Sequence, residues 1–343
     1  MARWTIFVCS IVILSIDFVI NVVCKKVDDH KLDDIDPVIV HWPEVNNNIS
    51  CHNSVDNDAL QSVEDPSFAP KTKSIFFHET SCRGGINSQQ ACAIESAARA
   101  HPKWDIYLLF NSPVNDTILK KSCIAKLRKY SNVKIARIHT NSFTSNTVVD
   151  SIVKNNLKNS VYPIEHTADI MKMLALNKWG GIYLDLDVLV QKPFDALPRN
   201  WIAKETAGEL SSGVMAFSKN GSGKNVTSAV LQEISQSYKH KSFGHNGASA
   251  IQRVLQRRCG NITRVYGNCK GISIFAHYWF YPIHYTWSHI LFNKGPLPAS
   301  VQEPYTNHMW TNIYPVHRES PFAKLAAKYC PNIFYMYGKE FGS

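Results

Sequence analysis

The stretch Trp179-Gly180-Gly181-Ile182-Tyr183-Leu184-Asp185-Leu186-Asp187-Val188-Leu189-Val190 determines the fold expected for this chain. Two glycines lead into an apolar run typical of a strand, and the run holds two carboxylates one residue apart. Residues i and i+2 of a strand point to the same face, so Asp185 and Asp187 are expected to project together. Burying both unpaired is costly, and a hard divalent ion such as Mn²⁺ or Mg²⁺ is the simplest cation to hold them. The alternative is an edge strand with a solvated polar face.

Length and composition set broad limits on the kind of protein. The chain has 343 residues, 45% of them hydrophobic, which is enough for one large α/β domain or two small ones. Its net charge of +10 suits anionic partners. No basic run is interleaved with aromatic residues, and no zinc-finger spacing or helix-turn-helix pattern is present, so nucleic acid is not expected as a partner.

The N-terminal segment is strongly apolar from residue 4 to residue 24. As a helix it would span about 30 Å, the thickness of a bilayer core. We therefore expect a cytoplasmic tail at 1–3 and a signal anchor at 4–24, which would give a single-pass type II protein. The alternative is a cleaved signal peptide with its apolar part at 6–16, because Asp17 costs about 3 kcal/mol near the bilayer centre. Both interpretations place the rest of the chain in the secretory pathway.

Sequons and cysteines agree with that compartment. The Asn-x-Ser/Thr sequons begin at Asn48, Asn115, Asn220, Asn225 and Asn261. Seven of the nine cysteines lie beyond the apolar segment, and because seven is odd, at least one lumenal thiol should remain unpaired. Cys259 and Cys269 close a short loop and are expected to pair, and Cys82 with Cys92 is a further possible pair.

The order of elements predicts the architecture. Residues 25–72 are rich in Asn, Asp and Pro and are expected to form a stem. Strands are expected at 74–79, 105–110 and 133–138, with helices at 89–100 and about 116–130 between them. This βαβαβ order indicates a parallel sheet in a Rossmann-like α/β layout. The fingerprint Gly-x-Gly-x-x-Gly is absent, so an NAD site is not expected.

The segments around the aspartates are expected to complete a site. A polar loop, expected to be mobile, occupies 140–159, and a helix at 164–179 then carries Asp169 and Lys172 on one face. In an open α/β sheet, ligands bind at the carboxyl ends of the strands, where the two aspartates are expected to lie. A strand at 211–217 and helices at 227–238 and 247–258 follow.

Seven ordered stretches of the chain resemble the α-1,4-galactosyltransferase family, which makes globotriaosylceramide, and the related α-1,4-N-acetylhexosaminyltransferases. The stretches are Ile75 to Ser81, Glu95 to Pro102, Gly180 to Asp187, Gly244 to Gly247, Phe280 to Ile283, His308 to Trp310 and Lys328 to Pro331. The resemblance implies a GT-A fold at 73–343, with a donor half at 73–200 and an acceptor half at 201–343. It also implies a nucleotide-sugar donor, Mn²⁺, and retention of the α configuration.

The resemblance further implies roles for individual residues. A metal held by Asp187, with Asp185 bound through water or touching the ribose, would neutralise the departing diphosphate as a Lewis acid. The residues expected to contact the donor are Asp169, Lys172, Tyr183, Asp185, Ser212 and Gly213. Similar glucosylating toxins have arginine where this chain has Lys172, and lysine lacks the bidentate fork of a guanidinium group. For Ser212 and Gly213, the alternative is a tight turn.

Two C-terminal positions have competing interpretations. His308 is expected to be the third metal ligand, or else a histidine packed on Trp310. Asn246 is expected near the anomeric carbon, where its amide would steady an oxocarbenium-like transition state by analogy with glycosidases. Its alternative role is a turn residue at the start of the next helix. The aromatic residues at 278–287 either stack on an acceptor sugar or pack in the core.

Together these implications describe a Golgi type II membrane enzyme with a lumenal catalytic domain. It would transfer galactose or N-acetylgalactosamine from UDP, in α-1,4 linkage, to a glycosphingolipid such as lactosylceramide. One alternative is an α-mannosyltransferase that uses GDP-mannose, which the stretches at 280–283 and 328–331 disfavour. The other is a lectin-like paralogue without turnover, which the aspartate pair disfavours.

Overall fold

The computed structural model describes residues 7–12, 21–26, 47–262, 264–310 and 315–342. The chain divides into two units, 1–36 and 37–343. In the first unit, β1 (Phe7–Val12) and β2 (Asn21–Lys26) pair antiparallel. The expected anchor at 4–24 lies only partly within the described residues, and residues 27–46 of the expected stem lie outside them. Within the described ranges, no helix has both the length and the apolar character needed to cross a membrane.

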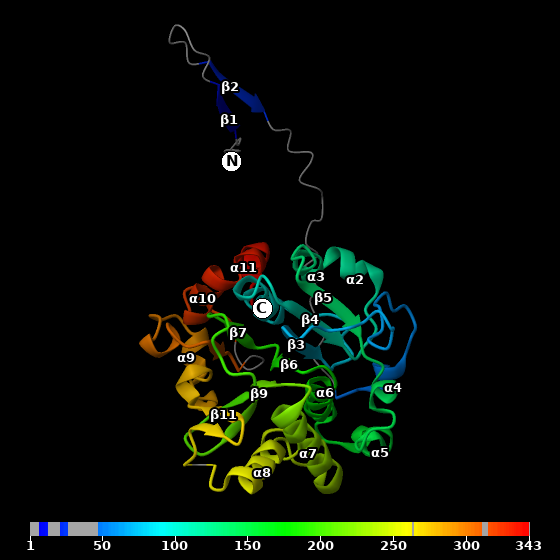
Figure 1. Ribbon diagram of the computed structural model, residues 1–343. Coiled ribbons are helices and arrows are strands. Elements are labelled where there is room, and N and C mark those ends of the chain that lie inside the picture. The colour runs from blue at the N-terminus through cyan, green and yellow to red at the C-terminus, as the bar shows by residue number, and fades with distance from the viewer. Residues whose placement is uncertain (1–6, 13–20, 27–46, 263, 311–314, 343) are drawn as a thin grey trace. The chain divides into compact units, whose positions relative to one another are not determined.

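An eight-stranded mixed sheet forms the centre of the second unit (Figure 1), in the order β10-β11-β8-β9-β6-β3-β4-β5. Its strands are β3 (Ser74–Glu79), β4 (Asp105–Phe110), β5 (Val133–Arg137), β6 (Gly181–Leu184), β8 (Trp201–Lys204), β9 (Leu210–Phe217), β10 (Gly267–Cys269) and β11 (Ile272–Phe275). β5, β4, β3 and β6 are neighbours and parallel, as the βαβαβ order predicts. β9 runs antiparallel to both β6 and β8, so the sheet is mixed, and the α/β class is confirmed.

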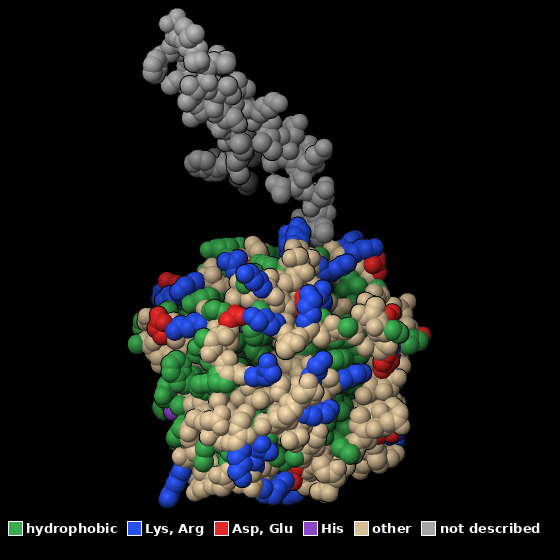
Figure 2. All heavy atoms as spheres, in the orientation of Figure 1, with side chains coloured by type: hydrophobic (Ala, Val, Ile, Leu, Met, Phe, Trp, Pro, Cys, Tyr) green, Lys and Arg blue, Asp and Glu red, His purple; other side chains and the backbone are tan. Residues whose placement is uncertain are grey.

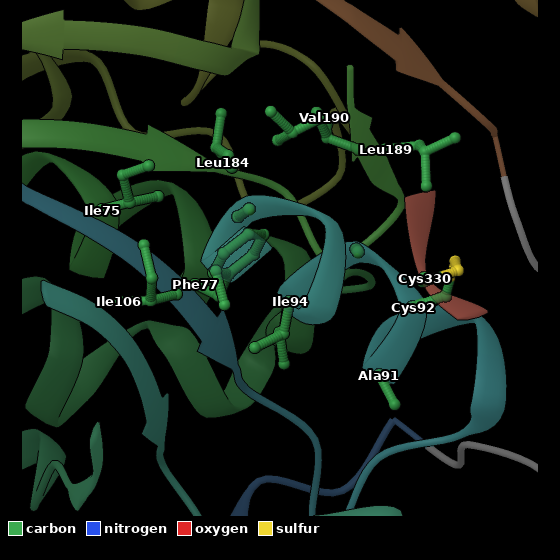
Figure 3. Packing of buried hydrophobic residues seen from close by; sticks show 14 of the residues in the cluster. Ile75, Phe77, Ala91, Cys92, Ile94, Ile106, Leu184, Leu189, Val190 and Cys330 are labelled. Carbon is green, nitrogen blue, oxygen red and sulfur yellow. A yellow bond between two sulfur atoms is a disulfide. The ribbon is translucent and has the colours of Figure 1, made fainter. Parts of the chain in front are cut away.

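Helices cover both faces of the sheet, because its strands are apolar on both sides. In β3, Ile75 and Phe77 pack into one core, while Phe76 packs into the other. The first core lies under α1 (Ser88–Ala100), α3 (Cys123–Leu127), α10 (Pro321–Tyr329) and α11 (Pro331–Tyr337). Figure 3 shows Ile94 of α1 beside Phe77 of β3 in this core. The second core lies under α6 (Pro163–Trp179), α7 (Gly221–Ser237) and α8 (Ala248–Cys259).

Three polar residues between Glu95 and His101 hold distant segments against the second half of α1. The buried Glu95 carboxylate accepts hydrogen bonds from the backbone N–H groups of Asn332 (3.1 Å) and Ile333 (2.7 Å), at the start of α11. Ser96 Oγ accepts from the N–H of Val190 at 2.9 Å. His101 Nε2 lies 2.9 Å from the N–H of Phe194 and accepts from it. The stretch from Glu95 to Pro102 therefore has a structural role in holding the segments that surround the aspartates.

The disulfides confirm one expected pair and correct the other. Cys259 and Cys269 are bonded. The pairing of Cys82 with Cys92 is wrong: Cys82 follows β3 and bonds Cys51, whereas Cys92 faces the C-terminal helices and bonds Cys330 (Figure 3). The leftover thiol is Cys123, which is buried in the first core.

Residues 47–72, expected to belong to the stem, pack against the domain. Arg137, fully buried at the end of β5, donates from Nε to Asp58 Oδ2 (2.8 Å). Its Nη2 donates to the backbone oxygens of Cys51 (3.1 Å) and Ser54 (3.0 Å). Val63 is also buried. The folded unit therefore begins before residue 73, because a buried guanidinium requires the acceptors that this segment supplies.

Two other expectations need correction. The segment 140–159 is not an irregular loop: it forms α4 (Thr140–Thr144), α5 (Asp150–Asn155) and a 3₁₀ turn at Leu157–Asn159. Five apolar residues scattered among its polar ones are buried, namely Phe143, Val149, Ile152, Val153 and Leu157. The helix expected at 116–130 is interrupted at Ser122, whose hydroxyl ends α2 (Asp116–Lys121) by donating to Ile118 O and caps α3 by accepting from Ile124 N–H.

Candidate active site at the end of strand β6

Asp185 and Asp187 lie in a turn, not on a continuous strand. β6 ends at Leu184, and β7 (Val188–Val190) begins after the turn, which the N–H of Val188 closes by donating to Asp185 O at 3.1 Å. The N–H of Asp185 donates to Gly213 O at 2.8 Å, so β9 holds the first aspartate in place. The expected same-face geometry of a strand is therefore wrong as the reason for their proximity. Their expected position, at the carboxyl end of a parallel strand, is confirmed.

The third member of the cluster arrives from the C-terminal part of the chain. β12 (Thr306–His308) pairs antiparallel with β7, and the N–H of Met309 donates to Asp187 O at 2.8 Å. His308 Nε2 consequently lies 3.4 Å from Asp187 Oδ1 and 3.8 Å from Asp185 Oδ2. One ligand atom from each of the three residues fits within 4.8 Å of the others. The His308 ring also lies 4.0 Å from the Trp310 ring, so it packs on Trp310 as the alternative interpretation expected, and its role as a metal ligand stays a prediction.

Lys172 lies beneath the cluster as its counter-ion. Its Nζ is 3.2 Å from Asp169 Oδ1 and 3.6 Å from Asp185 Oδ1, and it donates to Ser212 Oγ at 3.3 Å. The side chain is buried and also lies over the Tyr183 ring, 5.0 Å from its centroid. The helix face that carries Asp169 and Lys172 thus meets the aspartate turn, as expected. The ammonium group is already shared among protein acceptors, so we interpret its main role as holding the carboxylates.

The pKa shifts reflect this arrangement of charges. Burial raises the pKa of Asp169 and outweighs the effect of Lys172. Burial alone would also raise the pKa of Asp185, but Lys172 and His308 outweigh it and the pKa is lowered. Burial would lower the pKa of Lys172 and of His308, yet the neighbouring aspartates raise both. The cluster therefore favours an ionised Asp185 with cationic partners in Lys172 and His308, whereas the pKa of Asp169 is shifted towards the protonated form.

The donor set fits a divalent cation. Three carboxylates, those of Asp169, Asp185 and Asp187, meet one ammonium group and one imidazole, so negative charge is in excess. Asp185 and Asp187 are partly exposed, which leaves them open to a ligand. Carboxylate oxygens with an imidazole nitrogen suit Mn²⁺, and Mg²⁺ less well, because Mg²⁺ prefers oxygen ligands.

Glycines allow the close approach of backbone to these acids. A Cβ on Gly213 would lie 2.7 Å from Asp185 Oδ2 and 3.1 Å from His308 Nε2. A Cβ on Gly247, just before α8, would overlap the Asp169 carboxylate. Gly213 therefore belongs to the wall of the cluster, and the stretch Gly244 to Gly247 reaches the site through Gly247.

Asn246 lies in the same stretch, but its amide is engaged elsewhere. Its Oδ1 accepts from the N–H of Lys239 at 3.0 Å, and its Nδ2 donates to Lys239 O at 2.9 Å. Nδ2 also lies 3.1 Å from His166 Nε2, and the residue is buried. These contacts favour the alternative of a turn residue ahead of α8, and a catalytic role for Asn246 stays a prediction.

Residues near the cluster that the sequence did not single out include His78 and Glu205. His78, at the end of β3, is buried against Tyr183, with ring centroids 5.5 Å apart, and neither ring nitrogen has a hydrogen-bond partner among the described residues. Burial lowers its pKa to about 3. Glu205 follows β8; burial raises the pKa of its carboxyl group, and the nearby His308 opposes this shift. Only the resemblance signalled His78, which lies in the stretch Ile75 to Ser81, and nothing signalled Glu205.

Family models match most of the domain. Residues 87–207 match a glycosyltransferase sugar-binding region containing the DXD motif, and this range includes Asp185 and Asp187. The chain is therefore a glycosyltransferase of the DXD class. Residues 219–337 match the alpha 1,4-glycosyltransferase conserved region. The chain belongs to the α-1,4-glycosyltransferase family.

Individual relatives agree with this assignment. The lactosylceramide 4-alpha-galactosyltransferase of Homo sapiens is 26% identical over 278 residues, which are 78% of each chain. The alpha-1,4-N-acetylglucosaminyltransferase of Homo sapiens is 21% identical over 276 residues, covering 76% of this chain and 80% of the relative. A galactosyltransferase solved with donor and acceptor sugar analogues overlaps with a TM-score of 0.42 at 16% identity, covering 74% of this chain and 95% of that one. This structural overlap is too limited to add to the assignment.

Proposed function

We propose that this protein is a retaining glycosyltransferase of GT-A fold that transfers galactose or N-acetylgalactosamine from a UDP-sugar, in α-1,4 linkage, to a glycosphingolipid such as lactosylceramide. The observation that carries the proposal is the cluster of Asp185, Asp187 and His308 at the carboxyl end of β6. The relatives named as lactosylceramide galactosyltransferases support the choice of donor and acceptor. A GDP-mannose-dependent enzyme remains the competing donor assignment.

The reaction assigns tasks to the residues of the site. The bond between the sugar's anomeric carbon and the diphosphate breaks, a bond to the acceptor oxygen forms, and the acceptor's proton leaves with the diphosphate. Asp185, Asp187 and His308 would hold Mn²⁺, or Mg²⁺. Bound there, the ion would supply Lewis-acid stabilisation of the diphosphate's negative charge. Lys172 keeps Asp185 ionised and in place.

The remaining predicted donor residues surround this cluster. Asp169, held against Lys172 and facing Gly247, would accept hydrogen bonds from hydroxyl groups of the donor sugar. Ser212 and Gly213 lie on β9 beside Asp185 and would line the same pocket. Tyr183 lies under Lys172, where burial and the neighbouring Asp185 raise its pKa well above the usual value. It would therefore remain neutral while supporting the donor site.

We also propose a Golgi location, with a single-pass type II topology and the catalytic domain in the lumen. Three disulfides among the described residues are consistent with an oxidising compartment. The asparagines of all five sequons are exposed. Figure 2 shows Lys and Arg side chains spread over the drawn face rather than gathered in one patch. Immunolocalisation, combined with glycosidase sensitivity, tests the location: a cytosolic protein without glycans would contradict it.

Substitution of Asp187 tests the catalytic proposal. Asp187→Ala should fold with unchanged cysteine pairing but lose Mn²⁺ binding and Mn²⁺-dependent donor turnover, because a carboxylate ligand is missing. Asp116→Ala, which removes an exposed carboxylate on α2, is the matched control. Both variants are assayed with UDP-Gal, UDP-GalNAc and GDP-Man, and the products are read as mass shifts on a panel of glycolipids.

Each result of this experiment has a distinct meaning. Full activity in Asp187→Ala would refute the metal site. Turnover with GDP-Man alone would replace the proposed donor with that of the mannosyltransferases. A wild-type chain that turns over none of the three donors, with or without Mn²⁺, would support the lectin-like alternative.

A further inference from the structure

A hollow adjoins the aspartate cluster on the acceptor half of the domain. It has a volume of about 300 Å³, and its lining includes Glu205, Tyr281, His284 and Trp287. These residues come from the end of β8 and from the aromatic segment after β11. The hollow therefore combines a carboxylate, imidazoles and aromatic rings, the groups with which proteins bind sugars: acceptors and donors for hydroxyl groups, and flat rings for apolar C–H faces.

The wall of this hollow packs against His308 of the aspartate cluster. The Tyr281 ring lies 5.5 Å from the His308 ring, and the Trp310 ring lies 4.0 Å from it on another side. Trp310 Nε1 donates to the backbone oxygen of Ile283 at 2.8 Å. A molecule in the hollow would therefore lie against groups that directly contact His308.

Within the hollow, Glu205 is the one acid among the described lining residues. The backbone N–H of Glu205 donates to Glu209 O at 2.8 Å, which fixes the turn that presents its side chain. The side chain is partly buried, and this burial raises the pKa of the carboxyl group, an effect that the nearby His308 and His284 oppose. Trp287, another lining residue, is 63% exposed and so has uncovered ring surface to offer a ligand.

We propose that this hollow binds the terminal sugar of the acceptor, with Glu205 accepting hydrogen bonds from its hydroxyl groups and Trp287 packing against its C–H face. The inference rests on the proposed glycosyltransferase function and adds the acceptor subsite to it. Glu205 acts as a positioning residue: it orients the sugar so that the attacking hydroxyl faces the donor held at the aspartate cluster. Of the aromatic residues that line the hollow, Tyr281 is buried and forms part of its wall, whereas Trp287 is exposed and can contact a sugar.

Glu205→Gln tests the role of the carboxylate with the full chain and methyl β-lactoside, a soluble acceptor without a lipid tail. Because a hydrogen bond to a charged group contributes about 1.5–3 kcal/mol, the acceptor KM should rise about 10- to 100-fold. The donor KM and the rate of donor hydrolysis without acceptor should stay within about twofold, since the donor site is intact. Glu209→Gln, on the same turn and exposed, is the matched control and should change neither value.

Trp287→Ala provides an independent arm of the test. Loss of the ring face should raise the acceptor KM about 5- to 10-fold, the equivalent of about 1 kcal/mol of aromatic packing. Tyr335→Ala is its control, because Tyr335 on α11 is 69% exposed and lies outside the hollow. Melting temperatures of all four variants should match that of the wild type, which separates sugar binding from a structural role.

The outcomes distinguish this inference from the function on which it rests. An unchanged acceptor KM in Glu205→Gln, or a change in donor hydrolysis instead, would overturn the assignment of the hollow while leaving the glycosyltransferase proposal intact. Donor hydrolysis that is absent from the wild-type chain would overturn the proposed function itself, and the subsite with it.

Discussion

Replacing Gly213 by alanine should disturb the metal cluster without altering any ligand. Gly213 lies on β9, and its backbone oxygen holds the N–H of Asp185. An added Cβ would lie 2.7 Å from Asp185 Oδ2, whereas ordinary van der Waals contact begins at 3.4 Å. The carboxylate must therefore move by roughly 0.7 Å, and His308, 3.1 Å from the same Cβ, must also give way. The backbone of Gly213 needs no left-handed conformation, so the alanine itself is not strained.

The size of the effect follows from this displacement. The side chains of a binding or catalytic site must lie within about 0.5 Å of their productive positions, and a displacement of 1 Å can lower the rate about a hundredfold. We therefore expect Gly213→Ala to weaken Mn²⁺ binding about tenfold and to reduce donor turnover about 10- to 100-fold, equivalent to about 1.4–2.7 kcal/mol in the barrier. The unfolding transition should change little, because the clash concerns side chains at a partly exposed site.

Titration calorimetry with Mn²⁺ and donor hydrolysis measure the two effects. Gly244→Ala is the control, because a Cβ at Gly244 would meet no atom within 4 Å. It should behave like the wild type in both assays. Mn²⁺ binding within twofold of wild type in Gly213→Ala would refute the idea that Asp185 and His308 must keep their present positions to hold the ion.

Two further predictions concern stability. Arg137→Met should lower the free energy of unfolding by about 3–5 kcal/mol, because it leaves the buried Asp58 carboxylate without its cationic partner. The control Arg128→Met, at an exposed position, should lower it by less than about 0.5 kcal/mol. Equal values for the two variants in urea titrations would contradict the role of Arg137. Burial lowers the pKa of His101 to about 4, while its Nδ1 bonds Ala97 O and its Nε2 accepts from Phe194 N–H. As the pH falls below about 6.5, His101 is therefore protonated in the unfolded chain but not in the folded one. The free energy of unfolding should consequently fall by about 3 kcal/mol between pH 6.5 and pH 4. In His101→Gln, the pH dependence of unfolding should be shallower by one proton, and an unchanged slope would show that His101 does not titrate in this way.

The sequence correctly predicted those strands that are defined by their own apolar residues. The apolar runs at 74–79 and 105–110 have few alternatives to buried parallel strands, and the structure places strands there. The pair Asp185 and Asp187 indicated a cation site although the strand assumed for them is a turn. In the turn the two acids still lie together, beside Lys172 and His308, so the expectation of a cation there does not depend on the strand assumed for them.

Long-range partners could not be predicted from the residues alone. His308 reaches the cluster only because β12 pairs with β7, and only the family resemblance had pointed to it. Cys92 bonds Cys330 across 238 residues, so spacing along the chain favoured the nearer Cys82. Glu205 carried no signal, because a single acid after a strand is ordinary. Its surroundings depend on an aromatic segment that the topology brings back from far along the chain.

The pairing of β12 with β7 has a consequence for how the protein is made. During synthesis the βαβαβ half and the aspartate turn leave the ribosome before the segment that carries His308 and Cys330. Pairings between distant parts of a chain form slowly, because loop closure must come first. We therefore expect the cluster to assemble late in folding. Until then, Cys92 on α1 stays unpaired, because its partner Cys330 lies on the later segment. Metal binding in the newly made protein would therefore report that the whole domain, and not its first half alone, has reached the native state.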